Sequence, residues 1–256
     1  MQVAQEAFAY SGDVVVRQLF PAPEARIGFD ELRWGRLEHI GSPAYWASQA
    51  WIWEIEEPDH FRIGKSFEGE LLACLLGGYG SKAEVGLAAY YRLESMLRVD
   101  PSALRSEAKV LRALSAPFRV NRREVRYRFA RQKARYIAAS FSRVGAIDRS
   151  VPDRELRDSL TGLPGVGPKT ASWVVRNWRQ SDAVSVLDVH IIRAGRGLGL
   201  FPPHWRVQTR YEALERRYLD FARAIGARAS ILDSVMWMTM RSLPGGFRVT
   251  ATDAAV

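Results

Sequence analysis

One ten-residue stretch, residues 163–172, constrains the fold more than any other part of the sequence. It reads Leu-Pro-Gly-Val-Gly-Pro-Lys-Thr-Ala-Ser. Gly165 and Gly167 lie one residue apart, and such glycines permit a tight turn with positive φ and a close approach to the backbone. Pro168 presets the φ of the first position of a helix. The stretch therefore predicts two helices joined by a short turn, over about residues 153–179.

Apolar residues recur at helical spacing through most of the remaining sequence, and Gly or Pro interrupts each stripe. Val14–Val16 predicts a short strand that ends before Pro21. We therefore expect an all-α protein with a short N-terminal β element. The stripes predict helices over residues 43–57, 67–76, 83–97, 130–144, 207–225 and 228–241.

Positive charge is concentrated in one part of the chain. The 256 residues carry a formal net charge of +9, which is typical of proteins that bind nucleic acid. Nine Lys and Arg residues lie between Arg119 and Arg143, against one acidic residue, Glu124. The run begins in a predicted loop and continues along a helix. We expect it to contact DNA phosphates, Arg131 and Lys133 included, although a solvated helix face fits the same pattern.

Cys74 is the only cysteine in the sequence, and it lies in an apolar run. A single thiol cannot form an intrachain disulfide or a four-cysteine zinc or iron–sulfur site, so a buried, inert thiol is expected. Residues 1–6 lack the basic and apolar regions of a signal peptide. No apolar segment approaches the ~18–20 residues that span a membrane. We expect a cytoplasmic, nucleoid-associated monomer.

The turn is a candidate phosphate-binding site. A helix N-terminus presents unpaired N–H groups at the positive end of the helix dipole. Glycines without side chains let a DNA backbone reach those amides. We therefore expect Gly165, Val166, Gly167 and Thr170 to contact DNA, with an ordinary helix corner as the alternative.

Lys169 is the candidate nucleophile. It lies in the first turn of the second helix, where a cation is electrostatically disfavoured. The positive field there favours the neutral amine, which is the nucleophilic form of lysine. A lysine that reaches a phosphate fits the same position, so the placement alone leaves two roles open.

Asp188 is the candidate partner carboxylate. It follows a short apolar segment and begins another helix, so it suits an N-cap. If the intervening loop folds back, Asp188 lies beside Lys169. An amine next to a carboxylate is an arrangement that suits catalysis. His190 is expected to form a hydrogen bond within the fold rather than to act in catalysis.

These residues resemble a known family. Residues 163–169, followed by Asp188-Val189-His190, are similar to the signature of the helix-hairpin-helix DNA glycosylases. That superfamily includes endonuclease III, adenine mispair glycosylase and the 8-oxoguanine glycosylases. The resemblance covers about residues 67–200, and residues 169–177 look most like the second and archaeal types of 8-oxoguanine glycosylase.

The resemblance implies two helical domains with the active-site cleft between them. Residues 66–200 form one domain, which ends in the hairpin and the Asp188 helix. Residues 1–65 pack with residues 201–256 to form the other. The single cysteine places the chain among the members that lack an iron–sulfur cluster.

The resemblance also implies an activity. The target base of double-stranded DNA flips into the cleft, and a lysine at position 169 marks members that also cleave abasic DNA through a Schiff base. Asp188 then stabilises the cationic sugar. No metal or redox cofactor is needed for the chemistry, and in several relatives the hairpin carbonyls hold a monovalent cation.

Asp233 and Trp237 form the candidate base-recognition pair. They lie four residues apart on one face of the last helix, and the archaeal enzyme looks similar here. A carboxylate can accept hydrogen bonds from a guanine-type ring while an indole stacks on it. A core tryptophan beside a helix-terminal carboxylate is the alternative. Tyr79, between two glycines, is a candidate wedge residue or a packed turn.

Two other functions fit the same sequence. The chemistry could act on a different base, for example a hypermodified cytosine of phage DNA, in a defence role. A non-catalytic DNA-binding module is the third hypothesis, but such a module needs neither Lys169 nor Asp188.

Overall fold

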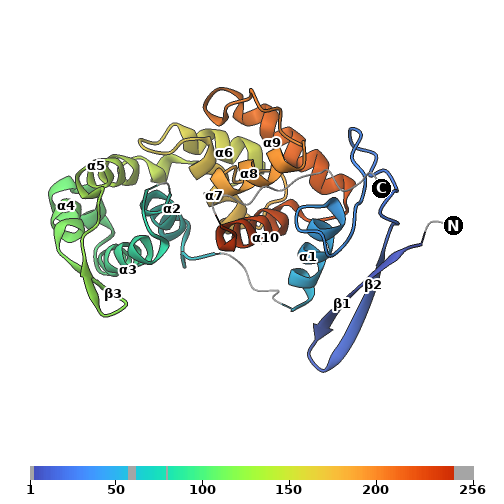
Figure 1. Ribbon diagram of the computed structural model, residues 1–256. Coiled ribbons are helices and arrows are strands. Elements are labelled where there is room, and N and C mark those ends of the chain that lie inside the picture. The colour runs from blue at the N-terminus through green and yellow to red at the C-terminus, as the bar shows by residue number, and fades with distance from the viewer. Residues whose placement is uncertain (1–2, 57–61, 79, 245–256) are drawn as a thin grey trace. The chain divides into compact units, whose positions relative to one another are not determined.

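The computed structural model describes residues 3–56, 62–78 and 80–244. In this part of the chain the secondary structure is almost entirely helical, with two small antiparallel sheets (Figure 1). The predicted all-α class and the N-terminal β element are therefore confirmed. None of the described helices is long and apolar enough to cross a membrane. Tyr79 lies outside the described residues.

The chain divides into two compact units: residues 1–60 together with 181–256 (unit 1), and residues 61–180 (unit 2). Unit 1 contains β1 (Gln5–Ser11), β2 (Val14–Phe20), α1 (Pro43–Glu56), α8 (Val189–Gly197), α9 (Val207–Ala224) and α10 (Ala229–Ser242). Unit 2 contains α2 (Phe67–Leu76), α3 (Ala83–Val99), α4 (Glu107–Ser115), β3 (Phe118–Val120), β4 (Arg123–Val125), α5 (Ala130–Phe141), α6 (Asp153–Thr161) and α7 (Pro168–Arg179), with 3₁₀ turns at Pro101–Arg105 and Val144–Ala146.

The core of unit 1 joins segments from both ends of the chain. Trp46 of α1 is fully buried together with Tyr218 of α9 and Met236 of α10. Leu187 and Ile191 lie in the same core. Residues 181–200, which the sequence interpretation grouped with residues 66–180, therefore belong to unit 1, because their apolar side chains pack against α1, α9 and α10.

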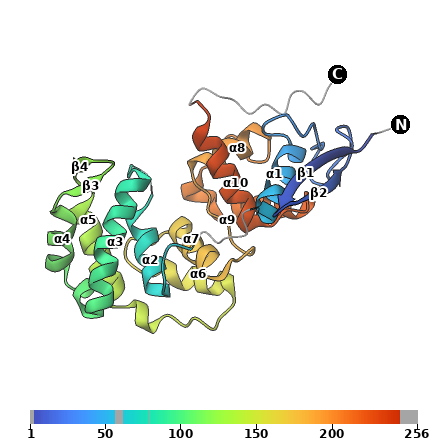
Figure 2. The same cartoon turned by 90° about the horizontal axis from the view of Figure 1, so that it is seen from below.

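Unit 2 is built around α2, whose ten residues are almost all buried. Ser66 caps the helix by accepting a hydrogen bond from the amide of Gly69 at 3.0 Å. The buried Glu70 carboxylate accepts hydrogen bonds from the amide of Gly64 and from the Asn177 side chain, each at 2.6 Å. Because Asn177 is on α7, this carboxylate fixes α7 to the centre of the unit. Figure 2 shows α2 between α3 and α7.

The basic segment begins differently from the sequence interpretation. Residues 118–125 form the β3–β4 hairpin rather than a loop, with Val120 paired to Arg123. Asn121 and Arg122 turn the chain with φ values of 48° and 64°. Neither is glycine, so the usual glycine signal for a two-residue hairpin turn is absent from the sequence.

We expect Gly195→Ala to destabilise unit 1. A Cβ at Gly195 on α8 would lie 2.3 Å from two ring carbons of the buried Phe201. Overpacking of this kind costs about 1–3 kcal/mol, whereas replacing a helical glycine by alanine gains roughly 1 kcal/mol in helix propensity. We expect the cost to be larger than the gain because the Phe201 ring is buried. Urea denaturation should show a net loss of stability of up to about 2 kcal/mol. The control is Gly145→Ala, where a Cβ meets nothing within 4 Å, and equal stability of the two variants would contradict the prediction.

Candidate functional site

The turn between α6 and α7 is held by α5. Gly165 has a φ of +79°, and a Cβ there would lie 2.4 Å from Cδ2 of Tyr136. The Tyr136 ring therefore occupies the space that a side chain at Gly165 would need. One turn further along α5, the Ser140 hydroxyl donates to the carbonyl of Pro164 at 2.8 Å. The helix hairpin predicted over residues 153–179 is present, and α5 fixes the conformation of its turn.

The N-terminus of α7 is open to a ligand. Gly167 is the N-cap and provides no side-chain hydrogen bond, and no acidic residue lies in the first turn. Gly167 and Pro168 are exposed, whereas Val166 is buried and anchors the turn. Because a Cβ at Gly167 would meet nothing within 4 Å, a phosphate oxygen can approach the amides there. Thr170 is half-buried in the same turn.

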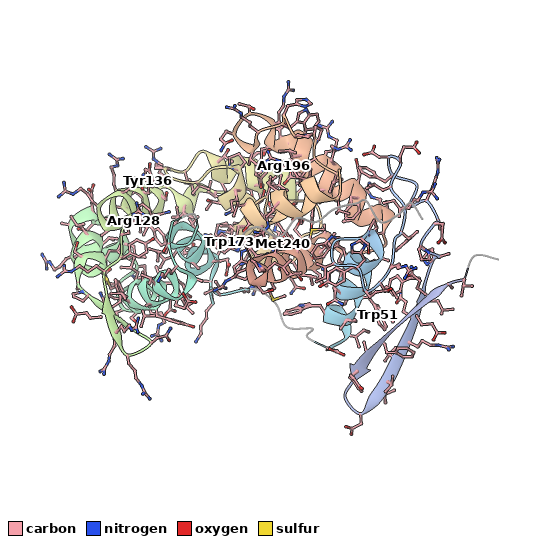
Figure 3. All side chains as sticks on the ribbon, in the orientation of Figure 1. Trp51, Arg128, Tyr136, Trp173, Arg196 and Met240 are labelled. Atoms are coloured by element: carbon pink, nitrogen blue, oxygen red, sulfur yellow. The ribbon has the colours of Figure 1, made fainter. Side chains whose placement is uncertain are left out.

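Lys169 is half-buried in this first turn. Its Nζ lies 6.0 Å from the ring centroid of Trp173, one helical turn further along α7. Trp173, which Figure 3 labels, also packs against Gly77 at the end of α2, where a Cβ would lie 2.8 Å from Cη2 of the indole. The amine thus lies within cation–π distance of the Trp173 ring.

A second lysine lies near the first. Lys133 on α5 is half-buried, while Arg131 is exposed. Burial lowers the pKa of Lys133, and the positive charge of Lys169 lowers it further. Arg131 is therefore accessible from solvent, whereas Lys133 is partly withdrawn from solvent and lies close enough to Lys169 for the two charges to interact.

Asp188 is the N-cap of α8, as the sequence predicted. Its Oδ1 accepts hydrogen bonds from the amides of His190 and Ile191, at 2.8 and 2.9 Å. Across the residues that the structure describes, Oδ2 accepts none. The carboxylate is half-buried, so one oxygen is fixed by the helix and the other is left for a different partner.

Asp233 and Trp237 lie on α10 beside the Asp188 segment. Asp233 is 2% exposed; its Oδ2 accepts a long hydrogen bond from the amide of Val186 at 3.4 Å, and its Oδ1 accepts one from the Ser234 hydroxyl at 3.1 Å. Trp237 is half-buried and meets the ring of His190 edge-on, with centroids 6.3 Å apart. His190 thus contacts a neighbouring ring within the fold.

The predicted residues therefore fall into two groups. Lys169 and the turn amides lie in unit 2, with Lys133 and Trp173 as neighbours. Asp188, Asp233 and Trp237 lie together in unit 1. The sequence interpretation missed Trp173 and Tyr136. The spacing of four between Lys169 and Trp173 placed them on one helix face, but no local signal connects Tyr136 to Gly165.

The comparisons with known proteins agree with this architecture. A model of the 8-oxoguanine DNA glycosylase family (Ogg-HhH) matches residues 64–227. No curated protein sequence matches the chain. The 8-oxoguanine DNA glycosylase of Methanocaldococcus jannaschii is 24% identical, with a TM-score of 0.53, over 70% of this chain and 80% of that one.

Two further solved structures share the fold. The 8-oxoguanine DNA glycosylase of Thermotoga maritima is 20% identical, with a TM-score of 0.52, over 69% of this chain and 82% of that one. A non-covalent complex of endonuclease III with DNA is 20% identical, with a TM-score of 0.58, over 80% and 86%. The fold and the hairpin together define a DNA glycosylase of the helix-hairpin-helix class.

The chain belongs to the 8-oxoguanine DNA glycosylase family, because the family model covers well over half of it. It is a DNA N-glycosylase, and DNA is its partner.

We expect Gly165→Ala to weaken DNA binding. The substitution forces a Cβ into the Tyr136 ring at a positive φ, so the turn that presents the amides must move. Affinity for an undamaged duplex should fall at least tenfold. The double variant Gly165→Ala/Tyr136→Ala removes the clash but keeps the strained φ and should recover part of the affinity. Unchanged binding by Gly165→Ala would show that the turn does not contact DNA.

Proposed function

We propose that this enzyme excises 8-oxoguanine from double-stranded DNA, with Lys169 as the nucleophile and Asp188 as the partner carboxylate. One observation carries the proposal: a half-buried lysine amine lies in the first turn of α7, directly beside an uncapped, exposed set of hairpin amides. Amides at such a terminus bind the phosphate backbone. A lysine placed there reaches the sugar of a nucleotide whose phosphates the hairpin holds.

The reaction follows from a neutral amine at this position. Nζ of Lys169 attacks C1′ of the flipped nucleotide, the bond between C1′ and the base breaks, and the base leaves with a proton. Loss of a proton from nitrogen and opening of the sugar ring give a Schiff base. Abstraction of a C2′ proton then expels the 3′ phosphate by β-elimination, which cuts the strand. No step requires a metal ion or a redox cofactor.

Asp188 contributes charge and proton transfer. The sugar becomes cationic as the base departs, and a fixed carboxylate stabilises that charge more than it stabilises the neutral substrate. The two amides of α8 orient Oδ1, while Oδ2 accepts no hydrogen bond within the described residues. In our proposal this second oxygen is the one that interacts with the cationic sugar.

Asp233 and Trp237 are proposed to recognise the base. An ionised carboxylate accepts hydrogen bonds from the N1–H and the exocyclic amine of a guanine-type ring, and adenine and cytosine lack that pair of donors. The Ser234 hydroxyl that bonds Oδ1 can rotate and donate to another acceptor. Trp237 offers an amphipathic ring that is only half-buried.

We expect Lys169→Ala to abolish the covalent intermediate. Borohydride added during the reaction reduces the Schiff base and should link the parent enzyme to damaged DNA. The matched control is Lys133→Ala, which removes the neighbouring amine and should still give the trapped species. Trapping by Lys169→Ala at the parent level would disprove the assignment of the nucleophile.

Asp188→Asn should separate capping from catalysis. Asparagine is also a good N-cap, so α8 and the melting temperature should be preserved. The charge is lost, so single-turnover excision should slow by at least about a hundredfold while DNA affinity is retained. An unchanged rate would leave Asp188 with its capping role alone.

The base specificity has its own test. Single-turnover excision should release 8-oxoguanine. Asp233→Ala should lower kcat/KM by a factor that corresponds to on the order of 2–5 kcal/mol of transition-state free energy. Trp237→Ala should cause a smaller loss. Asp182→Asn is the control carboxylate, because Asp182 bonds Ser230 and Arg228 at the start of α10, the same helix that carries Asp233, but has no part in the proposed base contact. Release of a modified cytosine with 8-oxoguanine left intact would refute the recognition pair and favour a defence role.

A further inference from the structure

The β3–β4 hairpin carries exposed arginines that the catalytic proposal does not use. Arg119, Arg122 and Arg123 are exposed, and none of the acidic side chains described in the structure pairs with them. Glu124, the cross-strand neighbour of Arg119 in the register, forms no ion pair with it. Figures 1 and 2 place the hairpin at the end of unit 2 away from α6 and α7, with its tip directed away from the helices. It is therefore a projecting, strongly basic element.

The tip holds an arginine in a conformation that favours glycine. Asn121 and Arg122 are the two central residues of the turn, and both have positive φ, as a type I′ turn requires. Asparagine tolerates this region, but a long side chain at the second position is disfavoured. A residue kept in a disfavoured conformation is best explained by what its side chain does. Glycine at this position would relieve the strain and remove the charge.

The base of the hairpin is held firmly. The guanidinium of Arg92 on α3 donates to the carbonyls of Ala113 and Ala116, each at 2.8 Å, and of Pro117 at 2.6 Å. It also stacks over the ring of Phe118, with Cζ 3.6 Å from the centroid. These contacts anchor the chain where it enters β3, so the arginines project from a fixed support.

Positive charge continues from the hairpin to the DNA-binding turn. β4 leads through Arg126 and Arg128 into α5, where Arg131 and Arg135 are also exposed. The next residue, Tyr136, packs on Gly165 of the α6–α7 turn. Figure 3 labels Arg128 and Tyr136 along this path. The hairpin is therefore the far end of a basic strip that reaches the turn.

We propose that the β3–β4 hairpin is an arginine arm that binds the phosphate backbone of duplex DNA flanking the damaged nucleotide. The inference rests on the proposed role of the α6–α7 turn in holding the phosphates near that nucleotide. The arm gives the enzyme a second, separate hold on the duplex. Its contribution is electrostatic and independent of sequence, and it requires DNA long enough to reach from the turn to the arm.

The test measures affinity for undamaged duplexes of two lengths across a range of salt. The triple variant Arg119→Glu/Arg122→Glu/Arg123→Glu should bind a long duplex at least tenfold more weakly than the parent. Its slope of log K against log salt should be smaller by about 2–3, since each lost phosphate contact removes about 0.9. A duplex too short to reach the arm should show little difference. A Lys triple variant at the same positions should behave like the parent.

A matched control separates local contact from net charge. Arg206, Arg210 and Arg216 are exposed in unit 1, and reversing these three changes the net charge equally. Equal losses in the two triple variants, or a loss that ignores duplex length, would overturn the proposal. Borohydride trapping at saturating enzyme should persist in the arm variant, so failure of the arm and failure of the Lys169 chemistry are distinguishable.

The single substitution Arg122→Gly should change stability and DNA affinity in opposite directions. Arg122→Gly relieves the positive φ, so the melting temperature should hold or rise. Affinity for the long duplex should fall about threefold or more, because one phosphate contact is lost. A variant that is more stable and binds DNA as well as the parent would show that Arg122 does not contact DNA.

Discussion

The contact between α5 and the α6–α7 turn is the interaction on which the conformation of that turn and the start of α7 depend. The Tyr136 ring can lie where it does only because residue 165 has no side chain. The ring and the Ser140 hydroxyl both hold the turn, and α7 begins directly after it. The amides, Lys169 and Trp173 all take their positions from that beginning. The missing side chain at Gly165 thus influences the positions of side chains a full turn away.

Short-range sequence patterns were sufficient to predict where α7 and α8 begin and which apolar stripes form helices. Pro168 after Gly167 predicted the start of α7, and Asp188 before an apolar helix predicted a cap that the structure confirms. The stripes of apolar residues predicted the helices because burial repeats with the helical period. The proposed chemical roles went beyond these signals and rested on the resemblance to a family.

The features that the sequence did not reveal depend on contacts between distant residues or on an unusual backbone. The β3–β4 turn uses Asn121 and Arg122 in place of glycine, so its signal was missing. Residues 181–200 follow the hairpin in sequence, but their apolar side chains belong to a core formed by α1, α9 and α10. Lys133 was placed with the exposed basic residues, because charge patterns alone do not distinguish a half-buried lysine from a solvated one.

The division of the chain has a consequence for how the protein is made. Unit 2 is continuous in sequence, while unit 1 needs residues from both sides of it. During synthesis, unit 2 can fold as soon as residue 180 has left the ribosome, since all its segments are then available. Trp46 and the rest of α1 must wait for α9 and α10, with their apolar surface uncovered in the meantime. The nascent chain therefore completes the α6–α7 turn before it can complete the core that carries Asp188.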